Sequence, residues 1–286
     1  MLLLEKFLNR DPLNKAEVKI QFCLNGGINL GKVETYLKER ISTYGAIHLS
    51  LIDPFEQQPE EAAKIASAAY EGGTDAILVG GSVGAQGEML DLTVKMIKEK
   101  VDLPIILFPG NVGTISRYAD AIYFMTMMNS RDPYFIMKAQ ILGSLLIKRF
   151  NLEPIPVAYI ILEPGGAAGW VGDANPVPRD DPEIAMACAL AGEYLGAHFI
   201  ITDSGSGAPT PAPPSLIKAV KSILSIPYIY AGGVRTADQA EQIVLAGADG
   251  IQVGTAIEHV EDLKKVREKV EKMVKAMRKA GKEKIK

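Results

Sequence analysis

Eight short apolar runs recur along the chain, each rich in β-branched or aromatic residues and each followed by Gly, Pro, Asp or Ser. They are near-continuous rather than alternating, as expected of parallel strands whose two faces are both buried. The runs predict strands within residues 46–53, 75–81, 104–110, 121–127, 157–166, 199–207, 228–234 and 250–257.

Segments with helical spacing lie between these runs. Residues 59–73 begin on Pro with acids in the first turn and end at Gly-Gly, and 88–101 have apolar positions at helical spacing. Residues 181–196 and 236–248 open on good capping residues and end near Gly. Eight strands alternating with helices predict an α/β fold, a (β/α)8 TIM barrel. An open doubly wound sheet is the alternative, but it usually has fewer strands and nothing marks a switch point.

The order of these elements predicts one domain over residues 1–286. Residues 1–44 form an N-terminal helical extension that closes the barrel bottom or pads its side, and 45–260 form the barrel. At about 150 residues per domain the length would also allow two domains. The Gly- and Pro-rich half of residues 199–214 resembles a linker, but both flanks belong to the same strand pattern.

The composition is that of a globular protein, with 48% hydrophobic and 23% charged residues and a net charge of −3. The two cysteines, Cys23 and Cys188, form no CxxC motif, so no disulfide framework or structural zinc is expected and a reducing cytoplasm is the default. The first residues lack the features of a signal peptide, and no window reaches the roughly 18 apolar residues of a membrane span. No nucleic-acid partner is expected.

The C-terminal segment 261–286 is basic, with 11 Lys and Arg against 5 Asp and Glu. It predicts a terminal amphipathic helix packed on the barrel, and transient contact with an anionic membrane surface is the alternative. An apolar stripe at helical spacing comprises Val266, Val270, Met273, Val274 and Met277.

Glycines mark the ends of the last three predicted strands. In this fold the carboxyl ends of the strands hold the functional residues, and the loops after strands seven and eight often bind phosphate. Gly232-Gly233 and Gly254-Thr255 stand at those two ends, where bare backbone can approach an anion. Gly205-Ser206-Gly207 after strand six can join the same site.

Acids and a hydroxyl stand at the ends of the first, second and sixth predicted strands. Asp203 can accept a hydrogen bond or a proton from a substrate hydroxyl, or it can merely cap its turn. Asp53 and Ser82 offer the hard oxygen ligands that suit Mg²⁺, although an Asp before Pro also commonly holds its own loop.

Two loops and the three histidines give weaker indications of function. The long loop after strand five contains Trp170, and loops of this length are usually functional. His48, His198 and His259 show no metal or triad spacing. The loop after strand four is rich in Met and aromatic residues that either line an apolar groove or form plain core, and these are Met127, Met128, Tyr134, Phe135 and Met137.

The ends of the predicted strands carry eight phrases in a fixed order between about residue 45 and 260: HLSLIDP, GGTDAILVGGSVG, LFPGN, ADAIYFMTMMNSRDPY, PGGAAGWVGDA, EYLGAHFIITDSGSGAP, YAGGVRT and GADGIQVGTAIE. Taken together, these phrases resemble geranylgeranylglyceryl phosphate synthases, in the larger of that family's two groups, which has a bacterial heptaprenyl relative. The resemblance implies a prenyltransferase of archaeal lipid assembly that joins sn-glycerol 1-phosphate to geranylgeranyl diphosphate, commonly as a homo-oligomer.

The resemblance also implies site residues. Asp53 and Ser82 match the family's Mg²⁺ ligands, and the prenyl chain would cross the mouth over strands two to four. The glycerol phosphate residues correspond to Ile201, Thr202, Asp203, Ser204, Gly205, Ser206, Gly207, Gly232, Gly233, Gly254 and Thr255.

The chain departs from the family pattern at two places. Ile201-Thr202-Asp203 stands where the family usually has Tyr-x-Glu, which removes a hydroxyl and shortens the acid. Phe55-Glu56 stands where Asp-Lys is expected, which removes a cation. Two other functions stay open: a sugar-phosphate isomerase using Asp53 and Glu163, and a barrel that binds a phosphorylated ligand without turnover. Prenyl chain length is not set by the sequence.

Overall fold

The computed structural model describes residues 31–258 and 262–284, and from Lys32 onward these belong to the compact unit Lys32–Lys286. Residues 1–30 of the predicted extension, with Cys23, lie outside the described residues, as does His259. From residue 32 the predicted extension is the helix α3 (Lys32–Tyr44), which leads into the first strand.

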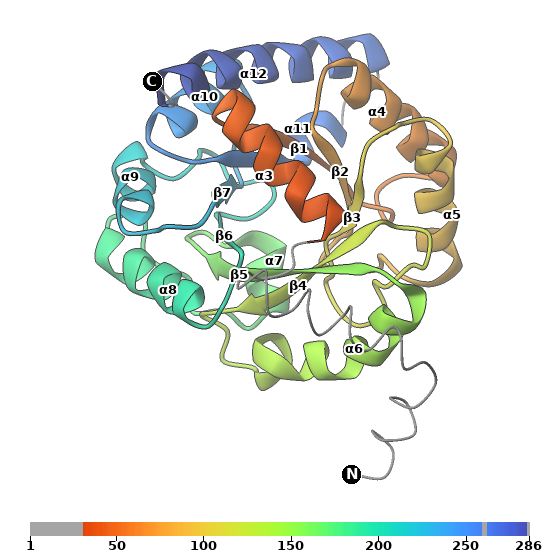
Figure 1. The fold of residues 1–286 in the computed structure, drawn as a ribbon, viewed down its shortest axis with the longest axis horizontal. Helices are drawn as coiled ribbons and strands as arrows, with labels where there is room; N and C mark the ends of the chain where they lie inside the picture. Colours follow the sequence, from red (N-terminus) through yellow and green to blue (C-terminus); the bar gives the residue numbers. More distant parts are fainter. Residues whose placement is uncertain (1–30, 259–261, 285–286) are drawn as a thin grey trace, which may run out of the picture. The chain divides into compact units, whose positions relative to one another are not determined.

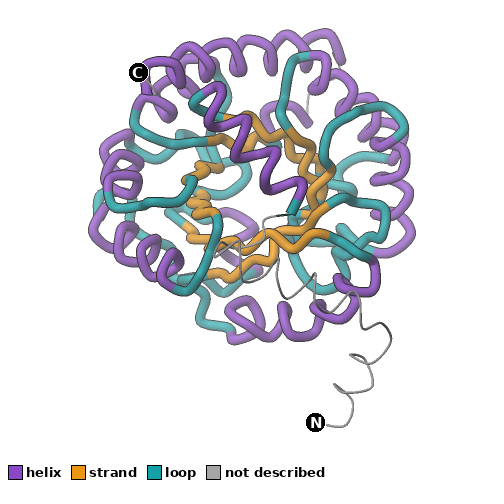
Figure 2. Tube along the Cα trace, in the orientation of Figure 1, coloured by secondary structure: helices purple, strands orange, loops and turns teal. Residues whose placement is uncertain are grey.

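Eight parallel strands close into a barrel in sequence order (Figures 1 and 2). Closure is visible at Ser50 of the first strand, which pairs with Ile77 on one side and Val253 on the other. The predicted (β/α)8 barrel is confirmed. Its strands are β1 (Ile47–Ile52), β2 (Ala76–Val79), β3 (Ile105–Leu107), β4 (Ala121–Met127), β5 (Glu153–Ile161), β6 (Phe199–Asp203), β7 (Tyr228–Ala231) and β8 (Gly250–Val253).

Helices follow the strands, and all four segments predicted as helical contain one. The helices are α4 (Pro59–Glu71), α5 (Gly87–Lys98), the π-helix η1 (Tyr134–Lys138), α6 (Ala139–Phe150), α7 (Gly166–Val171), α8 (Pro182–Tyr194), α9 (Pro214–Ser222), α10 (Ala237–Leu245), α11 (Thr255–Glu258) and α12 (Leu263–Lys284).

The connection from β3 to β4 departs from the predicted alternation, because residues 108–120 form a loop without a helix. Pro109 and Gly110 follow the strand directly, and the Asn111 side chain accepts a hydrogen bond of 2.7 Å from the Gly113 N–H. Such a local side-chain bond offers the backbone an alternative to helix formation.

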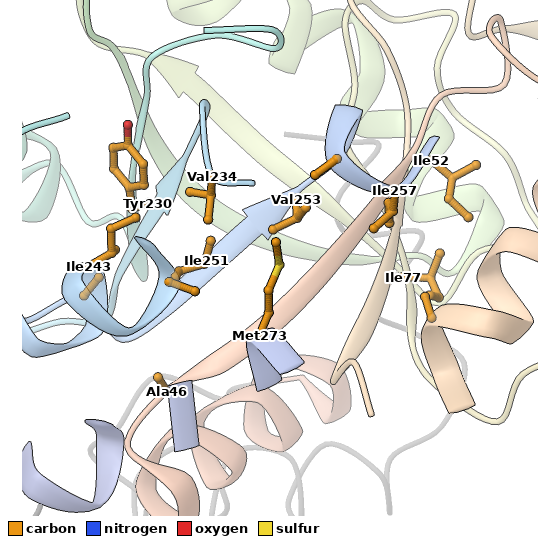
Figure 3. Close-up of a cluster of buried hydrophobic side chains, with 14 of the residues drawn as sticks. Ala46, Ile52, Ile77, Tyr230, Val234, Ile243, Ile251, Val253, Ile257 and Met273 are labelled. Atoms are coloured by element: carbon orange, nitrogen blue, oxygen red, sulfur yellow. The ribbon is translucent and has the colours of Figure 1, made fainter. Parts of the chain in front are cut away.

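Two layers of apolar side chains lie on either side of the barrel wall. Phe199 and Ile201 of β6 are fully buried in the interior layer. The outer layer lies between the strands and the helices, and Figure 3 shows Met273 of α12 pointing toward Ile251 and Val253 of β8. Alternate residues of each strand therefore serve opposite layers, which explains the near-continuous apolar runs.

Helix α3 closes the amino end of the barrel, one of the two positions expected for the extension (Figure 1). Val33 and Leu37 reach the interior layer. The Glu153 carboxylate at the start of β5 accepts hydrogen bonds of 2.8 Å from the N–H groups of Val33 and Glu34. These bonds satisfy donors that would otherwise be unpaired at the start of the helix.

The basic C-terminal segment forms α12, and all five residues of its apolar stripe are buried against the barrel. At its end, the Lys284 ammonium donates to the Ala248 carbonyl at 2.7 Å and to Asp249 Oδ1 at 2.9 Å. The stripe is thus used within the molecule and is not free to enter a bilayer. Within the described residues, none of the helices is both long and apolar enough to span a membrane.

Candidate active site

Two adjoining cavities open at the carboxyl ends of the strands, where barrels of this class hold their sites. Leu51, Phe108, Asp203 and Ser206 line both. The first cavity encloses about 710 Å³ and extends toward the apolar loop after β4. The second encloses about 480 Å³ at the glycine-rich ends of β7 and β8.

Asp53 follows β1 and lines the first cavity together with Ser82, so the structure brings these two predicted residues to one place. The Asp53 Oδ1 atom accepts a hydrogen bond of 2.9 Å from the Phe55 N–H. Burial raises the pKa of the Asp53 carboxyl, and the bond from Phe55 opposes that rise. A Cβ on Gly81 would lie 2.0 Å from Asp53 Oδ2, so the carboxylate needs glycine at that position.

Glu258 is a third residue of this corner that the sequence analysis did not single out. Its Oε1 atom accepts a hydrogen bond of 2.8 Å from the Asp53 N–H, and its side chain lines the first cavity. Burial raises the pKa of Glu258 to about 7, and the nearby carboxylates of Asp53 and Glu56 add to the rise. Two carboxylates that line the same cavity repel each other, and a bound cation would offset this repulsion.

The donor set at this corner fits Mg²⁺. Carboxylate and hydroxyl oxygens are the ligands this ion prefers, and it usually keeps several waters and takes one or two carboxylates plus substrate phosphates. Among residues 31–258 and 262–284, no three His, Cys, Asp or Glu side chains form a metal-binding group. A corner of two carboxylates with Ser82 is therefore compatible with Mg²⁺ that also binds water and substrate phosphate. It offers too few protein ligands to surround a metal ion completely.

Asp203 ends β6 at the boundary between the two cavities. Its Oδ2 accepts a hydrogen bond of 2.6 Å from the Tyr159 hydroxyl, and its Oδ1 accepts one of 2.6 Å from the Gly205 N–H. Burial raises the pKa of Asp203 above its ordinary value, and these two bonds oppose the rise. Both oxygens are thus held in fixed directions inside the site.

The second cavity has a wall of bare backbone. Gly232 and Gly233 adopt positive φ angles of 92° and 73°. A Cβ on Gly232 would lie 2.8 Å from the Ser204 nitrogen, so the two turns approach each other without room for a side chain. In the same cavity, the Ser206 and Thr255 hydroxyls lie 2.5 Å apart. Glycine turns and hydroxyl groups of this kind suit a phosphate.

Arg235 supplies a positive charge in the wall of the second cavity. Its guanidinium donates to the carbonyls of Ala208 at 2.6 Å and Pro209 at 3.0 Å. These bonds fix the loop that follows Gly205–Gly207. Arg235 was not predicted from the sequence, although it lies only two residues after the predicted glycine pair.

Three residues of the predicted glycerol phosphate segment have side chains that line neither cavity. Ile201 is fully buried in the interior layer. The Thr202 hydroxyl lies 2.6 Å from the Tyr228 hydroxyl, and the Ser204 hydroxyl lies 3.0 Å from that of Tyr230. Gly205 binds Asp203 through its backbone, whereas Ser206, Gly207, Gly254 and Thr255 line the second cavity.

Strand β4 and the π-helix η1 that follows it provide apolar walls. Met125, Met127 and Phe135 line the first cavity and also a third one of about 520 Å³, which continues toward Ile115 and Ile147. Trp170 of α7 is 84% exposed and lies outside the first cavity, although Ala168 and Val171 of the same helix line it. Of the five residues predicted to line a groove or form core, Met127 and Phe135 line the first cavity and Tyr134 the third, whereas Met128 packs against the outer layer and Met137 is exposed.

Other candidate residues fall away from the site. Glu163, which an isomerase would need opposite Asp53, is exposed and lines neither of the two adjoining cavities. His198 lies 2.8 Å from Glu34 of α3 at the other end of the barrel, and His48 is buried beside Thr74. Cys188 is a free, partly buried thiol. The structure therefore does not bring together the two acids, Asp53 and Glu163, that the isomerase alternative needs.

Residues 35–280 match the PcrB family. The chain is 53% identical over 246 residues to the geranylgeranylglyceryl phosphate synthase of Thermococcus kodakarensis, covering 86% of this chain and 97% of that protein. It is 52% identical over 233 residues to the enzyme of the same name from Methanosarcina acetivorans, covering 81% of this chain and 94% of that one.

Among solved structures, the chain is similar to geranylgeranylglyceryl phosphate synthase of Thermoplasma acidophilum, determined in complex with the substrate sn-glycerol-1-phosphate. The TM-score is 0.81 at 36% identity, covering 85% of this chain and 98% of that one.

Proposed function

The chain belongs to the PcrB family, and we propose that it forms the ether bond between the 3-hydroxyl of sn-glycerol 1-phosphate and C1 of geranylgeranyl diphosphate, releasing diphosphate. One observation carries the proposal: a polar, glycine-walled cavity and an apolar cavity meet at the buried carboxylate of Asp203. A transfer between a phosphorylated alcohol and a long apolar donor needs such a junction.

The second cavity binds glycerol 1-phosphate. The backbone around Gly232 and Gly233, the hydroxyls of Ser206 and Thr255 and the charge of Arg235 surround the phosphate. Anchoring the phosphate in this fixed wall places the far hydroxyl at the boundary with the first cavity. Fixing the two reactants in this way lowers the entropic part of the barrier.

Asp203 then orients the 3-hydroxyl and accepts its proton. The hydroxyl oxygen forms a bond to the allylic C1 as the bond from C1 to the diphosphate oxygen breaks, and the electron pair leaves with the diphosphate. A carboxyl whose pKa burial raises is a better proton acceptor than an exposed one. The Tyr159 hydroxyl and the Gly205 N–H keep the carboxylate oriented throughout.

Asp53 and Ser82 are the proposed Mg²⁺ ligands, and Glu258 holds Asp53 in place through the backbone. Bound Mg²⁺ would neutralise the charge that develops on the departing diphosphate. The prenyl chain lies along Met125, Met127 and Phe135 and continues into the third cavity.

A turnover assay tests the proposal. Purified protein is incubated with Mg²⁺, sn-glycerol 1-phosphate and geranylgeranyl diphosphate, and the ether product is sought by mass spectrometry. Loss of product in EDTA and its return with added Mg²⁺ test the metal requirement. Shorter and longer prenyl diphosphates test chain length. Phosphate binding without any ether product would favour the non-catalytic alternative.

Self-association is also part of the proposal. Three apolar side chains on one surface of α6 are well exposed: Ile141 by 64%, Leu142 by 57% and Leu145 by 82%. Clusters of exposed apolar side chains often mark protein interfaces. Light scattering of the purified protein, compared with a Leu145→Glu variant, tests whether this surface forms a homo-oligomer.

A further inference from the structure

Gln252 stands out because its amide is buried without a partner. It lies on β8 and is 4% exposed. Neither its amide oxygen nor its amide nitrogen has a hydrogen-bond partner in the described part of the chain. A buried amide without partners costs free energy, so it needs a reason.

The side chain of Gln252 forms part of the wall of the second cavity. Asp203 pairs with Ala231, and Ala231 pairs with Gln252, so the three residues form one row across β6, β7 and β8. All three line the second cavity, and the small side chain of Ala231 leaves the space between the other two open. An unpartnered amide and a carboxylate thus flank one polar space.

The neighbouring polar groups are already engaged. Asp203 is assigned to the reacting 3-hydroxyl and also accepts hydrogen bonds from Tyr159 and Gly205, and Ile201 has no polar side-chain atom to offer. The amide of Gln252 provides a donor nitrogen and an acceptor oxygen, and a hydroxyl can form a hydrogen bond with either.

The position of Gln252 indicates which hydroxyl of glycerol phosphate it can bind. Asp203 lines both cavities and meets the reacting 3-hydroxyl, whereas Gln252 lines only the second, phosphate-binding cavity. The group between the phosphate and the 3-hydroxyl is the secondary hydroxyl at C2. The phosphate ester oxygen beside it can accept a hydrogen bond from the amide nitrogen of Gln252.

We propose that Gln252 binds the C2 hydroxyl of the glycerol phosphate and thereby determines recognition of the glycerol unit and of its enantiomer. This inference rests on the proposed function. It assigns a specificity role to a residue that the sequence analysis did not mark, in the row that also holds Asp203.

The experiment compares sn-glycerol 1-phosphate, its enantiomer sn-glycerol 3-phosphate, and 3-hydroxypropyl phosphate, which lacks only the C2 hydroxyl. With the wild-type protein, Mg²⁺ and geranylgeranyl diphosphate, kcat/KM should be about ten-fold or more higher for glycerol 1-phosphate than for the deoxy compound. Gln252→Met, similar in size but without the amide, should bring this ratio close to one. The change should come through the KM for glycerol 1-phosphate, leaving the KM for the prenyl diphosphate unaltered.

Thr93→Val is the matched control. Thr93 is a buried residue of α5 whose hydroxyl also lacks a partner among the described residues, and it lines neither cavity. Its replacement should leave the ratio unchanged. If Gln252 were only structural, Gln252→Met would lower the unfolding temperature and keep the ratio.

The inference is overturned if the wild-type protein has equal kcat/KM for glycerol 1-phosphate and 3-hydroxypropyl phosphate. It is also overturned if the Gln252→Met variant keeps the wild-type ratio of these two kcat/KM values. If the Met variant does not fold, the wild-type comparison alone still decides the role of the C2 hydroxyl. If the wild-type protein forms no ether, the proposed function fails. Calorimetric binding of the three phosphates then tests Gln252 separately, and a lack of preference for glycerol 1-phosphate overturns it.

Discussion

Asp203 combines burial, a raised pKa and two fixed hydrogen bonds at the meeting point of the cavities. Asp203→Asn keeps the shape and can still pair with Tyr159 and Gly205, but it cannot take a proton from the substrate. We expect kcat to fall by about 10²- to 10⁴-fold, the usual contribution of a general base, with little change in the KM for glycerol 1-phosphate. Steady-state kinetics with circular dichroism of the variant measures this, and near-wild-type turnover would show that the base assignment is wrong.

Two tyrosines of the barrel interior provide a control for Asp203. Tyr159→Phe removes the hydrogen bond to Asp203 Oδ2 and should reduce kcat, by less than Asp203→Asn does. Tyr123 packs against the same Phe108 ring, but its hydroxyl has no partner in the described structure. Tyr123→Phe should therefore leave kcat unchanged. Equal effects of the two substitutions would point to packing and not to the hydrogen bond.

His48 predicts how stability depends on pH. Burial lowers its pKa from 6.5 to about 4, so the folded protein binds fewer protons than the unfolded chain between those values. The contribution of His48 to the free energy of unfolding should thus be fully present above pH 6.5. It should fall as the pH drops toward 4, by roughly 3 kcal/mol at most.

Urea denaturation at several pH values tests the His48 prediction. His48→Asn keeps a polar atom for Thr74 and should flatten the pH dependence, whatever it does to stability at neutral pH. Ile47→Val, in the same strand, should lower stability and keep the wild-type slope. An unchanged slope in His48→Asn would assign the pH dependence to other groups.

The turn that ends β2 positions the proposed Mg²⁺ ligands, and Gly81 is its critical residue. A Cβ there would overlap Asp53 Oδ2, so Gly81→Ala should displace the carboxylate. We expect the Mg²⁺ concentration for half-maximal activity to rise by about ten-fold or more, since one displaced ligand costs at least about 1.4 kcal/mol. Mg²⁺ titration of turnover gives the measurement.

A double-mutant cycle isolates the effect of Gly81. If Gly81→Ala acts by moving Asp53, it should have little further effect on the Mg²⁺ requirement in an Asp53→Ala background. Independent, additive effects of the two substitutions would mean that the turn influences the site by another route.

Helix α12 docks by close backbone contact at its end. A Cβ on Gly281 would lie 2.1 Å from the Tyr44 carbonyl oxygen, which belongs to the backbone and cannot rotate away. Gly281→Ala should lower the free energy of unfolding by about 1–3 kcal/mol, as overpacking does. Lys282→Ala at the exposed neighbouring position should change it little. Thermal unfolding of both variants tests the contact, and equal unfolding temperatures would contradict it.

The sequence predicted the elements better than their connections. Apolar runs bounded by Gly and Pro located all eight strands, because burial on both faces leaves a strong signal. The missing helix after β3 was not predicted, since the alternation of the other elements was extended to it. The bond from Gly113 to Asn111 and the Pro109-Gly110 pair were local signals against a helix there.

At the scale of the whole barrel, the site was predictable by strand end but not by side-chain direction. Successive strand residues point to opposite faces, so placing Asp203 inside already implies that Thr202 and Ser204 point outward. Contacts between strands were beyond the sequence: Tyr159 reaches Asp203 through the pairing of β5 with β6, and Glu258 reaches Asp53 across 205 positions. Gln252 was hidden within an apolar run.

The division into two cavities also predicts how ligands stabilise the whole molecule. The second cavity includes neither Asp53 nor Ser82, so glycerol 1-phosphate should bind without metal, whereas diphosphate should need Mg²⁺ at the first. At 100 times its dissociation constant, a ligand stabilises the fold by about 2.7 kcal/mol. That corresponds to a rise in unfolding temperature of roughly 4–5 °C for a chain of this size.

Thermal shift measurements in EDTA and in Mg²⁺ test this division. Glycerol 1-phosphate should raise the unfolding temperature equally in both buffers, and inorganic diphosphate only in Mg²⁺. Asp53→Ala should abolish the effect of diphosphate and leave that of glycerol 1-phosphate, because the substitution changes the wall of one cavity only. A metal requirement for both ligands would mean that the two cavities act as one site around the ion.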